Sequence, residues 1–249
     1  MKHLITRQRQ EPRRRHLTVK EKTNITPLML RILLTGEDLA DFNSPGADDH
    51  VKLFIANGGD KPEMRDYTPR SFDRAARTLA IDFAIHEAGP ATRWALEAKP
   101  GDNVQIGGPR GSMVISPTFD WWLLMGDETA LPAIGRRIEE LPAGTKVTSI
   151  VTVSGKEEEQ SFNTQAQHEA IWVHRPLSRA DDPAPLLEAL RALAWPADGD
   201  GFVFVAAEAR VARAARDYIE NSKGHPAAWT KAAGYWVKGV ADGDKTLDG

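Results

Sequence analysis

The spacing of hydrophobic residues changes near the middle of this chain. Before residue 117 it indicates short strands separated by turn-rich breaks, and from residue 118 onward strands alternate with helices. Short, evenly spaced strands are typical of an antiparallel barrel, whereas strand–helix alternation predicts a parallel sheet covered by helices. The sequence therefore predicts two domains, an antiparallel β-barrel over residues 1–117 and an α/β domain over residues 118–249, with a boundary near residues 116–120.

Individual elements follow from the same periodicity. In the first half, strands are expected at residues 26–35, 50–55, 64–71, 78–86 and 103–106, and a helix at residues 90–98. In the second half, strands are expected at residues 121–125, 146–153, 170–173 and 202–206, and helices at residues 130–141, 185–193 and 211–221. The Gly- and Asp-rich end after Val240 is expected to be a mobile tail.

Composition excludes several functional classes. A net charge of −3 argues against a nucleic-acid-binding protein, and the arginines near the start, Arg7, Arg9 and residues 13–15, are interpreted as a solvated strand lead-in. With no cysteine, the chain has no disulfide, no thiolate nucleophile and no cysteine-ligated metal. No run approaches the length of a membrane span, and the start lacks the apolar core of a signal peptide. A cytoplasmic protein is expected, and any redox chemistry needs a dissociable organic cofactor.

One short motif, RDYTP at residues 65–69, combines a cation, a phenol and a hydroxyl. In an extended segment Arg65 and Tyr67 project to one face and Thr68 to the other, and the residue before a proline is held extended. Arginine offers a planar fork to a pyrophosphate, each charge-assisted bond contributing roughly 1.5–3 kcal/mol. Tyr67 and Thr68 could supply a wall and hydrogen bonds to an isoalloxazine edge. The segment fits a flavin dinucleotide, and the alternative is a polar strand with a surface ion pair.

A second candidate site is the expected helix start at residues 89–92. Gly89 as cap and proline at the first helical position would leave the amides of Ala91 and Thr92 pointing outward, which favours an anion. A simple helix start is the alternative. His86, at the end of the preceding strand, could bond a flavin or ribityl oxygen, or it could be structural.

Two glycine-containing turns complete the pattern. Residues 107–112 form a glycine-rich turn after a strand, and residues 126–132 join a strand to a helix, where parallel sheets bind nucleotides. The second turn lacks the G-x-G-x-x-G pattern. Asp127 or Thr129 could therefore serve as a helix cap instead.

Taken in order, these segments resemble the siderophore-interacting proteins, a family of flavin-dependent ferric-siderophore reductases related to ferredoxin reductases. The resemblance extends over nearly the whole chain, through DHVKLF (49–54), RDYTP (65–69), DFAIH (82–86), GPATRWA (89–95), GPRGS (108–112), GDETALPAI (126–134) and GYW (234–236). It implies a six-stranded antiparallel FAD-binding β-barrel followed by an α/β, NAD(P)H-binding-like domain with a parallel sheet, a ferredoxin-reductase-like fold. FAD would lie in the cleft between the two domains.

The resemblance also implies roles for single residues. Arg65, Tyr67 and Thr68 would hold the isoalloxazine and a phosphate, and Asp82 and His86 would line the flavin. The helix start would cradle the pyrophosphate through Gly89, Ala91 and Thr92. Glu128 and Thr129 would contact the nucleotide end of FAD or the reductant. Cofactor binding is also expected of Gly111, Ser112 and Asp127. Trp236 would stack on an aromatic ring of FAD, unless it packs at the sheet edge.

The reaction implied by this resemblance is hydride transfer from NADH or NADPH to FAD, followed by single-electron transfer to a ferric siderophore. No catalytic side chain and no resident metal are expected, because the flavin carries the chemistry. Two alternatives remain, a general NAD(P)H:flavin or ferredoxin reductase and a non-enzymatic siderophore carrier. A monomer is expected.

Substrate and donor are predicted from charge. Ferric siderophores such as tris-catecholates are anionic, so cations are expected at the substrate site; the resemblance points to Lys52, to Arg137 or its neighbour Arg136, and to Lys238. The acidic run at residues 157–159 disfavours a 2′-phosphate and favours NADH, whereas His174 and Arg175 could instead receive that phosphate. Ferredoxin is an alternative donor.

Overall fold

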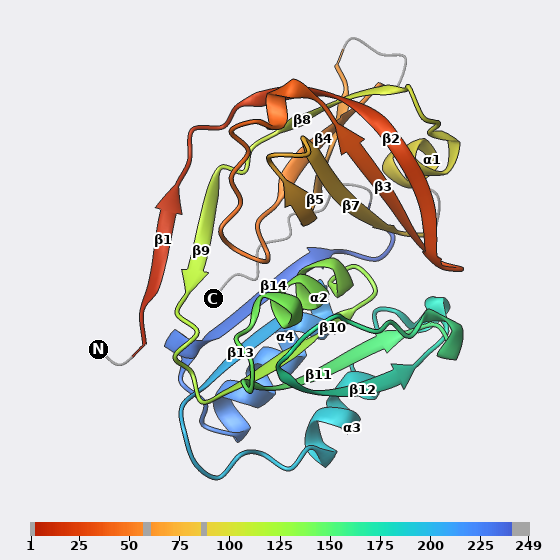
Figure 1. Ribbon diagram of the computed structural model, residues 1–249. Helices are drawn as coiled ribbons and strands as arrows, with labels where there is room; N and C mark the ends of the chain where they lie inside the picture. Colours follow the sequence, from red (N-terminus) through yellow and green to blue (C-terminus); the bar gives the residue numbers. More distant parts are fainter. Residues whose placement is uncertain (1–2, 57–60, 86–88, 241–249) are drawn as a thin grey trace. The chain divides into compact units, whose positions relative to one another are not determined.

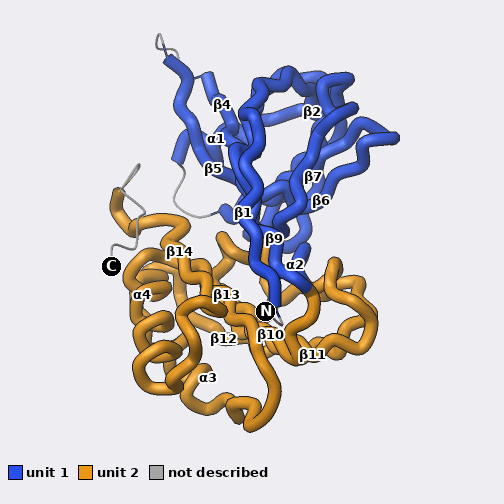
Figure 2. Tube along the Cα trace, turned by 90° about the vertical axis from the view of Figure 1, so that its left-hand side faces the viewer, with its two compact units in different colours: residues 1–116, 135–137 blue, residues 117–134, 138–249 orange. Residues whose placement is uncertain are grey.

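The computed structural model describes residues 3–56, 61–85 and 89–240. The chain divides into two compact units (Figure 2), unit 1 with residues 1–116 and 135–137, and unit 2 with residues 117–134 and 138–249. His86 and the expected mobile tail lie outside the described residues. Within the described ranges, no helix is both long enough and apolar enough to cross a membrane.

Unit 1 is built on a curled antiparallel sheet. In spatial order its strands are β5 (Glu63–Tyr67), β4 (Val51–Ile55), β8 (Asn103–Gly107), β2 (Arg14–Thr26), β3 (Met29–Thr35), β7 (Thr78–Ala84) and β6 (Pro69–Asp73). The two edge strands, β5 and β6, are consecutive in the chain and separated by Thr68 alone, so the curled sheet brings its edges together at this residue. The expected antiparallel barrel is confirmed as a curled sheet, with seven described strands where six were expected.

Two expected strands differ in detail. The segment at residues 64–71 is divided into β5 and β6, and most of the segment at residues 26–35 is β3, paired with the long strand β2 in a hairpin. A separate two-stranded sheet pairs β1 (Ile5–Arg9) with β9 (Gly111–Ile115).

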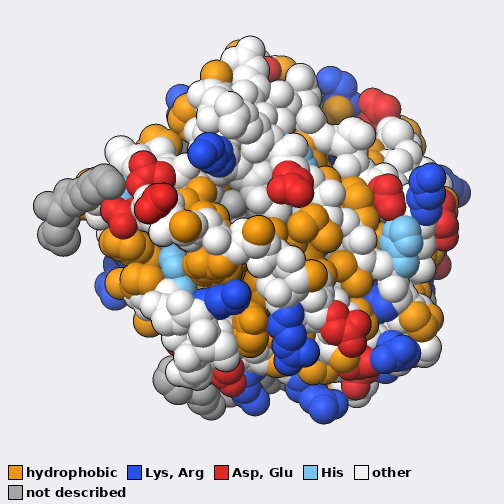
Figure 3. All heavy atoms as spheres, turned by 90° about the horizontal axis from the view of Figure 1, so that it is seen from below, with side chains coloured by type: hydrophobic (Ala, Val, Ile, Leu, Met, Phe, Trp, Pro, Cys, Tyr) orange, Lys and Arg blue, Asp and Glu red, His pale blue; other side chains and the backbone are white. Residues whose placement is uncertain are grey.

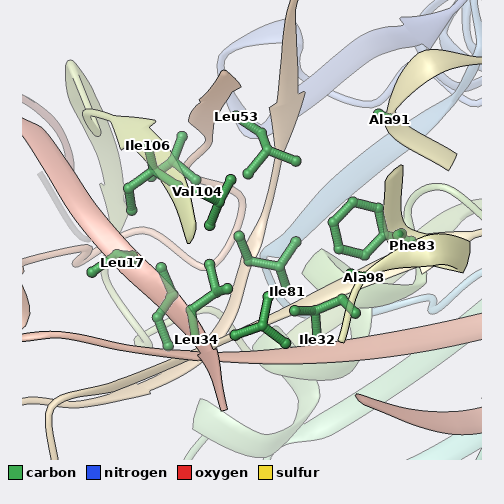
Figure 4. Close-up of a cluster of buried hydrophobic side chains, with 14 of the residues drawn as sticks. Leu17, Ile32, Leu34, Leu53, Ile81, Phe83, Ala91, Ala98, Val104 and Ile106 are labelled. Carbon is green, nitrogen blue, oxygen red and sulfur yellow. The ribbon is translucent and has the colours of Figure 1, made fainter. Parts of the chain in front are cut away.

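The core of unit 1 lies inside the curl. Alternation in β3 buries Leu30, Ile32 and Leu34, and strands β2, β4, β7 and β8 add buried aliphatic residues to the same cluster (Figure 4). Helix α1 (Pro90–Glu97) contributes Ala91 and Ala95 to it. The helix start is therefore anchored to the barrel by its own buried face.

Unit 2 contains a five-stranded parallel sheet with the order β12 (Gln167–His174), β11 (Lys146–Val153), β10 (Trp121–Asp127), β13 (Gly201–Glu208) and β14 (Thr230–Trp236). All residues of β10 and β13 are buried, as expected for central strands. Helices α3 (Ala184–Ala192) and α4 (Ala209–Asp217) pack on one face, and α2 (Leu131–Glu140) lies on the other (Figure 1). The expected parallel sheet is confirmed, with β14 as an additional strand.

The part of the chain that the structure describes also contains five short helical turns: Glu37–Leu39, Lys156–Glu158, Leu177–Arg179, Tyr218–Ser222 and Ala227–Trp229. Seen from below the view of Figure 1, acidic, basic and hydrophobic side chains are interspersed on the surface (Figure 3). No single sign of charge dominates the visible face.

Candidate functional site

The RDYTP motif runs from the end of β5 to the start of β6. The ring of Tyr67 packs against Phe83 of β7 with the centroids 4.3 Å apart, and Phe83 in turn lies 5.8 Å from the ring of Trp94 in α1. Burial raises the pKa of Tyr67, so its phenol stays protonated. Contacts among these three aromatic rings hold the motif close to helix α1.

Arg65 is mostly enclosed, with 17% of its side chain exposed. Its guanidinium donates to the Glu63 carboxylate over 2.9 Å and to the Met64 carbonyl over 2.9 Å. A phosphate at Arg65 would therefore compete with Glu63 for the guanidinium.

Among the described residues, no side chain caps the start of helix α1. Proline occupies its first position, and the first helical hydrogen bond runs from the Arg93 amide to the Gly89 carbonyl. A Cβ added at Gly89 would meet no heavy atom within 4 Å, so open space adjoins the helix start. Ala91 and Thr92 are buried there. Uncapped amides beside open space fit a pyrophosphate.

Asp82 is buried and binds arginines. Both of its oxygens accept from Arg31, over 2.6 and 2.7 Å, and Arg70 Nε lies 3.8 Å from Oδ2. Arg70 follows Thr68 by two residues at a register shift between β6 and β7, and it is 7% exposed. Asp82 thus fixes two guanidiniums beside the motif. Sequence reasoning missed Arg70, although its position directly after the motif was a usable signal.

Ser112 lies in a buried cluster around Asp49. Asp49 Oδ2 accepts from Ser112 Oγ at 2.7 Å, Ser44 Oγ at 3.0 Å and the Gly46 amide at 3.1 Å, and Gln10 donates to Ser112. Gly111 precedes it in β9. Burial raises the pKa of Asp49 against the opposing effect of these hydrogen bonds. The hydroxyl of Ser112 is therefore committed to this cluster.

The Asp49→Asn variant tests the cost of this buried charge. Because all three bonds meet one oxygen, Asn can keep them, so its melting temperature at pH 7–8 should equal or exceed that of the wild type. The pKa of Asp49 is raised in the folded state, so the protonated group favours folding at low pH and that contribution is lost as the pH rises through the folded-state pKa. The advantage of Asn should thus shrink on acidification. Thermal melts of Asp49→Asn and Asp49→Ala at several pH values check this, and equal losses in both variants would contradict it.

Asp127 connects three strands at the carboxyl edge of unit 2. It is 1% exposed and ends β10. Its carboxylate accepts from Thr129 N and Oγ1, from the Glu208 amide over 2.8 Å and from Trp236 Nε1 over 2.9 Å. The half-buried indole of Trp236 is thereby fixed at the end of β14, as the sheet-edge alternative requires.

Glu128 forms a largely buried ion pair with Arg175. Its oxygens lie 2.7 and 3.3 Å from the two terminal guanidinium nitrogens, and 3% of the Arg175 side chain is exposed. Burial raises the pKa of Glu128, the neighbouring Asp127 charge raises it further, and Arg175 opposes both. Arg175 is therefore turned inward, which argues against the expectation that it receives a 2′-phosphate. His174 pairs with Glu159 over 2.9 Å.

The expected substrate cations occupy different environments. Lys52 Nζ lies 2.8 Å from Asp66, and Lys238 Nζ lies 2.7 Å from Asp181 and also contacts the Ser178 carbonyl. Arg136 is buried and donates to the Ser44 hydroxyl and the Pro69 carbonyl, each over 2.9 Å. Burial removes Arg136 as a surface cation and leaves the partly exposed Arg137 as the candidate.

A separate pocket of about 570 Å³ opens at the other edge of the unit 2 sheet. It lies by the amino ends of β10, β11 and β12 and the end of α3, and none of the predicted site residues lines it. It is therefore distinct from the candidate site.

Comparisons with known proteins match both units. Residues 119–239 match the model of the siderophore-interacting protein family, and residues 18–63 and 55–113 match that of the siderophore-interacting FAD-binding domain. An NADPH-dependent ferric-chelate reductase of Escherichia coli is 32% identical over 251 residues, 92% of this chain and 95% of that protein. A ferric vibriobactin reductase of Vibrio cholerae is 29% identical over 246 residues, 90% of each chain.

Solved structures give the same match. A siderophore utilization protein from T. fusca is 35% identical, with a TM-score of 0.90 over 97% of this chain and 99% of that chain. Two ferredoxin reductases, 14% and 9% identical, have TM-scores of 0.63 and 0.66 and share the fold alone. The ferredoxin-reductase-like fold expected from the sequence is thereby confirmed.

Proposed function

This chain belongs to the siderophore-interacting protein family, and from that premise we propose that it is a ferric-siderophore reductase. It is an FAD-dependent oxidoreductase. In the proposed reaction, electrons pass from NADH or NADPH through FAD to an anionic Fe(III)–siderophore, and Fe(II) is released in the cytoplasm. Fe(II) binds hard oxygen ligands more weakly than Fe(III), so reduction frees the metal.

One observation carries the proposal. The uncapped start of α1 and the RDYTP motif are held together by the Tyr67–Phe83–Trp94 row, and open space adjoins Gly89. Gly89, Ala91 and Thr92 would bind the pyrophosphate, and Arg65 would add a planar cation. Tyr67 and Thr68 would orient the isoalloxazine.

Bound FAD would accept two electrons as a hydride and deliver them singly to the ferric chelate. The side chains bind and orient the reactants, and no side chain is assigned a proton-transfer role. Variants at Arg65 or in α1 are therefore expected to lower activity by lowering FAD occupancy.

Reconstitution tests the proposed function. Protein incubated with FAD should turn yellow and retain the flavin through gel filtration. With NADH or NADPH it should then convert a ferric tris-catecholate to Fe(II), measured with a ferrous-specific chromophoric chelator. A colourless protein that binds the chelate but takes up no FAD would indicate a carrier. Fast reduction of free flavin without ferric-chelate turnover would indicate a general flavin reductase.

The substrate cations provide a kinetic prediction. Replacing Lys52, Arg137 and Lys238 together by glutamine should raise the apparent KM for the ferric siderophore about tenfold at low ionic strength, because charge steering is lost. FAD content should not change. The matched control replaces three other surface cations, Lys20, Arg74 and Lys99. Unaltered kinetics of the first variant at low salt would rule out the assignment.

A further inference from the structure

The carboxyl edge of the unit 2 sheet carries acidic side chains where related folds bind phosphate. Open α/β sheets bind nucleotides at the carboxyl ends of their strands, with phosphates at helix starts. From the contacts at this edge we infer that unit 2 does not recognise the pyrophosphate of a dinucleotide, and that the donor is recognised through its nicotinamide mononucleotide half. The inference rests on the proposed function for the identity of the reaction.

The turn after β10 illustrates the difference. Asp127 already binds the Thr129 amide in this turn, and Glu128 follows it. Gly126 is required by packing, because a Cβ there would lie 2.3 Å from the Ala206 carbonyl oxygen and 2.6 Å from the Ala130 Cβ. Glycine is therefore needed here for the close contact between β10, β13 and the start of α2. The turn itself places carboxylates where a phosphate would lie.

The turn after β11 also carries acidic side chains. A Cβ added at Gly155 would lie 2.5 Å from Glu157 Oε1, so this carboxylate covers the glycine. Glu158 is buried beside it, and Glu159 binds His174. A phosphate approaching this backbone would meet the carboxylates of Glu157 and Glu159 as well as the exposed Lys156.

The helices on the α3 and α4 face also start at carboxylates. Glu208 Oε2 accepts from the Arg210 amide over 2.7 Å and from the Val211 amide over 3.4 Å, which caps α4. Asp182 accepts from the Ala184 amide at the start of α3 over 3.0 Å. These amides are therefore occupied by groups of the chain itself, unlike the uncapped start of α1 in unit 1.

Three cations at this edge are paired with acids. Arg175 pairs with Glu128, and Asp181 lies 2.7 Å from Lys238 Nζ and 3.5 Å from Arg210 Nη1. Binding a pyrophosphate or a 2′-phosphate through these three cations would require breaking their pairs with surrounding carboxylates. The adenosine phosphate half of the donor should thus contribute little to affinity.

Fragment binding tests the inference without electron transfer. FAD-loaded protein is titrated calorimetrically with ADP, with 2′,5′-ADP and with inorganic pyrophosphate. No saturable binding is expected below about 1 mM, the weak end of specific association. Micromolar binding of any of the three would overturn the inference. The result is independent of whether the protein reduces ferric siderophores, because no iron is present.

Stopped-flow reduction of the bound flavin gives a second readout. Reduced nicotinamide mononucleotide should reduce the flavin with a second-order rate constant within about threefold of that for NADH, and the rate with NADPH should rise with ionic strength because salt screens like charges. If the rate constant for reduced nicotinamide mononucleotide is more than about 100-fold below that for NADPH, the missing half contributes substantially to binding. That result would overturn the inference.

A charge variant tests whether repulsion by the acidic side chains, and not a general lack of affinity for NADPH, limits the reaction. Glu157→Gln with Glu159→Gln should raise the NADPH rate constant about threefold to tenfold at low salt, because the repulsion is reduced. Glu169→Gln, on β12 near its amino end, is the matched control and should leave the rate unchanged. An equal response of the two variants would show that the acidic edge does not set donor recognition.

Discussion

Replacing Arg175 by methionine should lower the free energy of unfolding of unit 2 by about 3–5 kcal/mol, because it leaves the carboxylate of Glu128 buried without its cation. The pair is enclosed, with 3% of the Arg175 and 13% of the Glu128 side chain exposed, so water cannot replace the guanidinium. Urea denaturation followed by circular dichroism measures the change. A melting temperature lower by roughly 6–20 °C is the corresponding thermal effect.

The pH dependence of this loss identifies its cause. The pKa of Glu128 is already raised by burial, and removing Arg175 takes away an effect that lowers it. A protonated Glu128 favours the folded state below its unfolded-state pKa, and this contribution is lost as the pH rises through the folded-state pKa. The defect of Arg175→Met should therefore be largest at neutral pH and smaller in acid.

Two further variants make the test decisive. Arg179→Met removes an arginine from an exposed ion pair with Asp182 and should leave stability nearly unchanged. Adding Glu128→Gln to Arg175→Met should recover much of the loss, because the buried charge is gone. If Arg175→Met is as stable as Arg179→Met at neutral pH, the Glu128–Arg175 pair has no structural importance.

Replacing Arg65 by alanine should weaken FAD binding about tenfold to 150-fold, since one charge-assisted bond contributes roughly 1.5–3 kcal/mol. The side chain lies on β5 beside the half-buried Tyr67, and the Glu63 carboxylate holds its guanidinium. Flavin fluorescence during titration of the apoprotein measures the Kd.

The structure also predicts the sign of a change at Glu63. Glu63→Gln should tighten FAD binding, because a neutral amide competes less with a phosphate for Arg65. Arg65→Lys should fall between wild type and Arg65→Ala, because it keeps the charge without the planar fork. Arg74→Ala, in the turn between β6 and β7, is the matched control. Full FAD affinity in Arg65→Ala would show that Arg65 is no phosphate ligand.

Much of the fold follows from local patterns. Alternation in Leu30, Ile32 and Leu34 predicted β3, and glycine followed by proline at residues 89–90 predicted the start of α1, found at Pro90. The division of the motif at Thr68 had no local signal, because it depends on two sheet edges meeting there. Strand β14 was missed because its residues, such as Lys231 and Ala232, lack the β-branched pattern of a buried strand.

The sequence predicted the types of residue in the candidate site more reliably than the groups that those residues contact. The motif identified Tyr67, but its packing on Phe83 depends on a strand distant in sequence. Arg136 and Arg175 were expected to meet anionic ligands, yet each is buried against the chain itself. A sequence identifies a cation, whereas burial and partners arise from tertiary packing.

Anaerobic single turnover tests the proposed reductase activity most directly. Protein carrying FAD is photoreduced, freed of donor and mixed with a ferric tris-catecholate, while flavin absorbance and trapped Fe(II) are recorded together. We predict that the flavin reoxidises and two Fe(II) appear for each flavin, because FAD transfers two electrons and each Fe(III) accepts one. A reduced flavin that persists beside excess ferric chelate, with no Fe(II) formed, would contradict the proposed function.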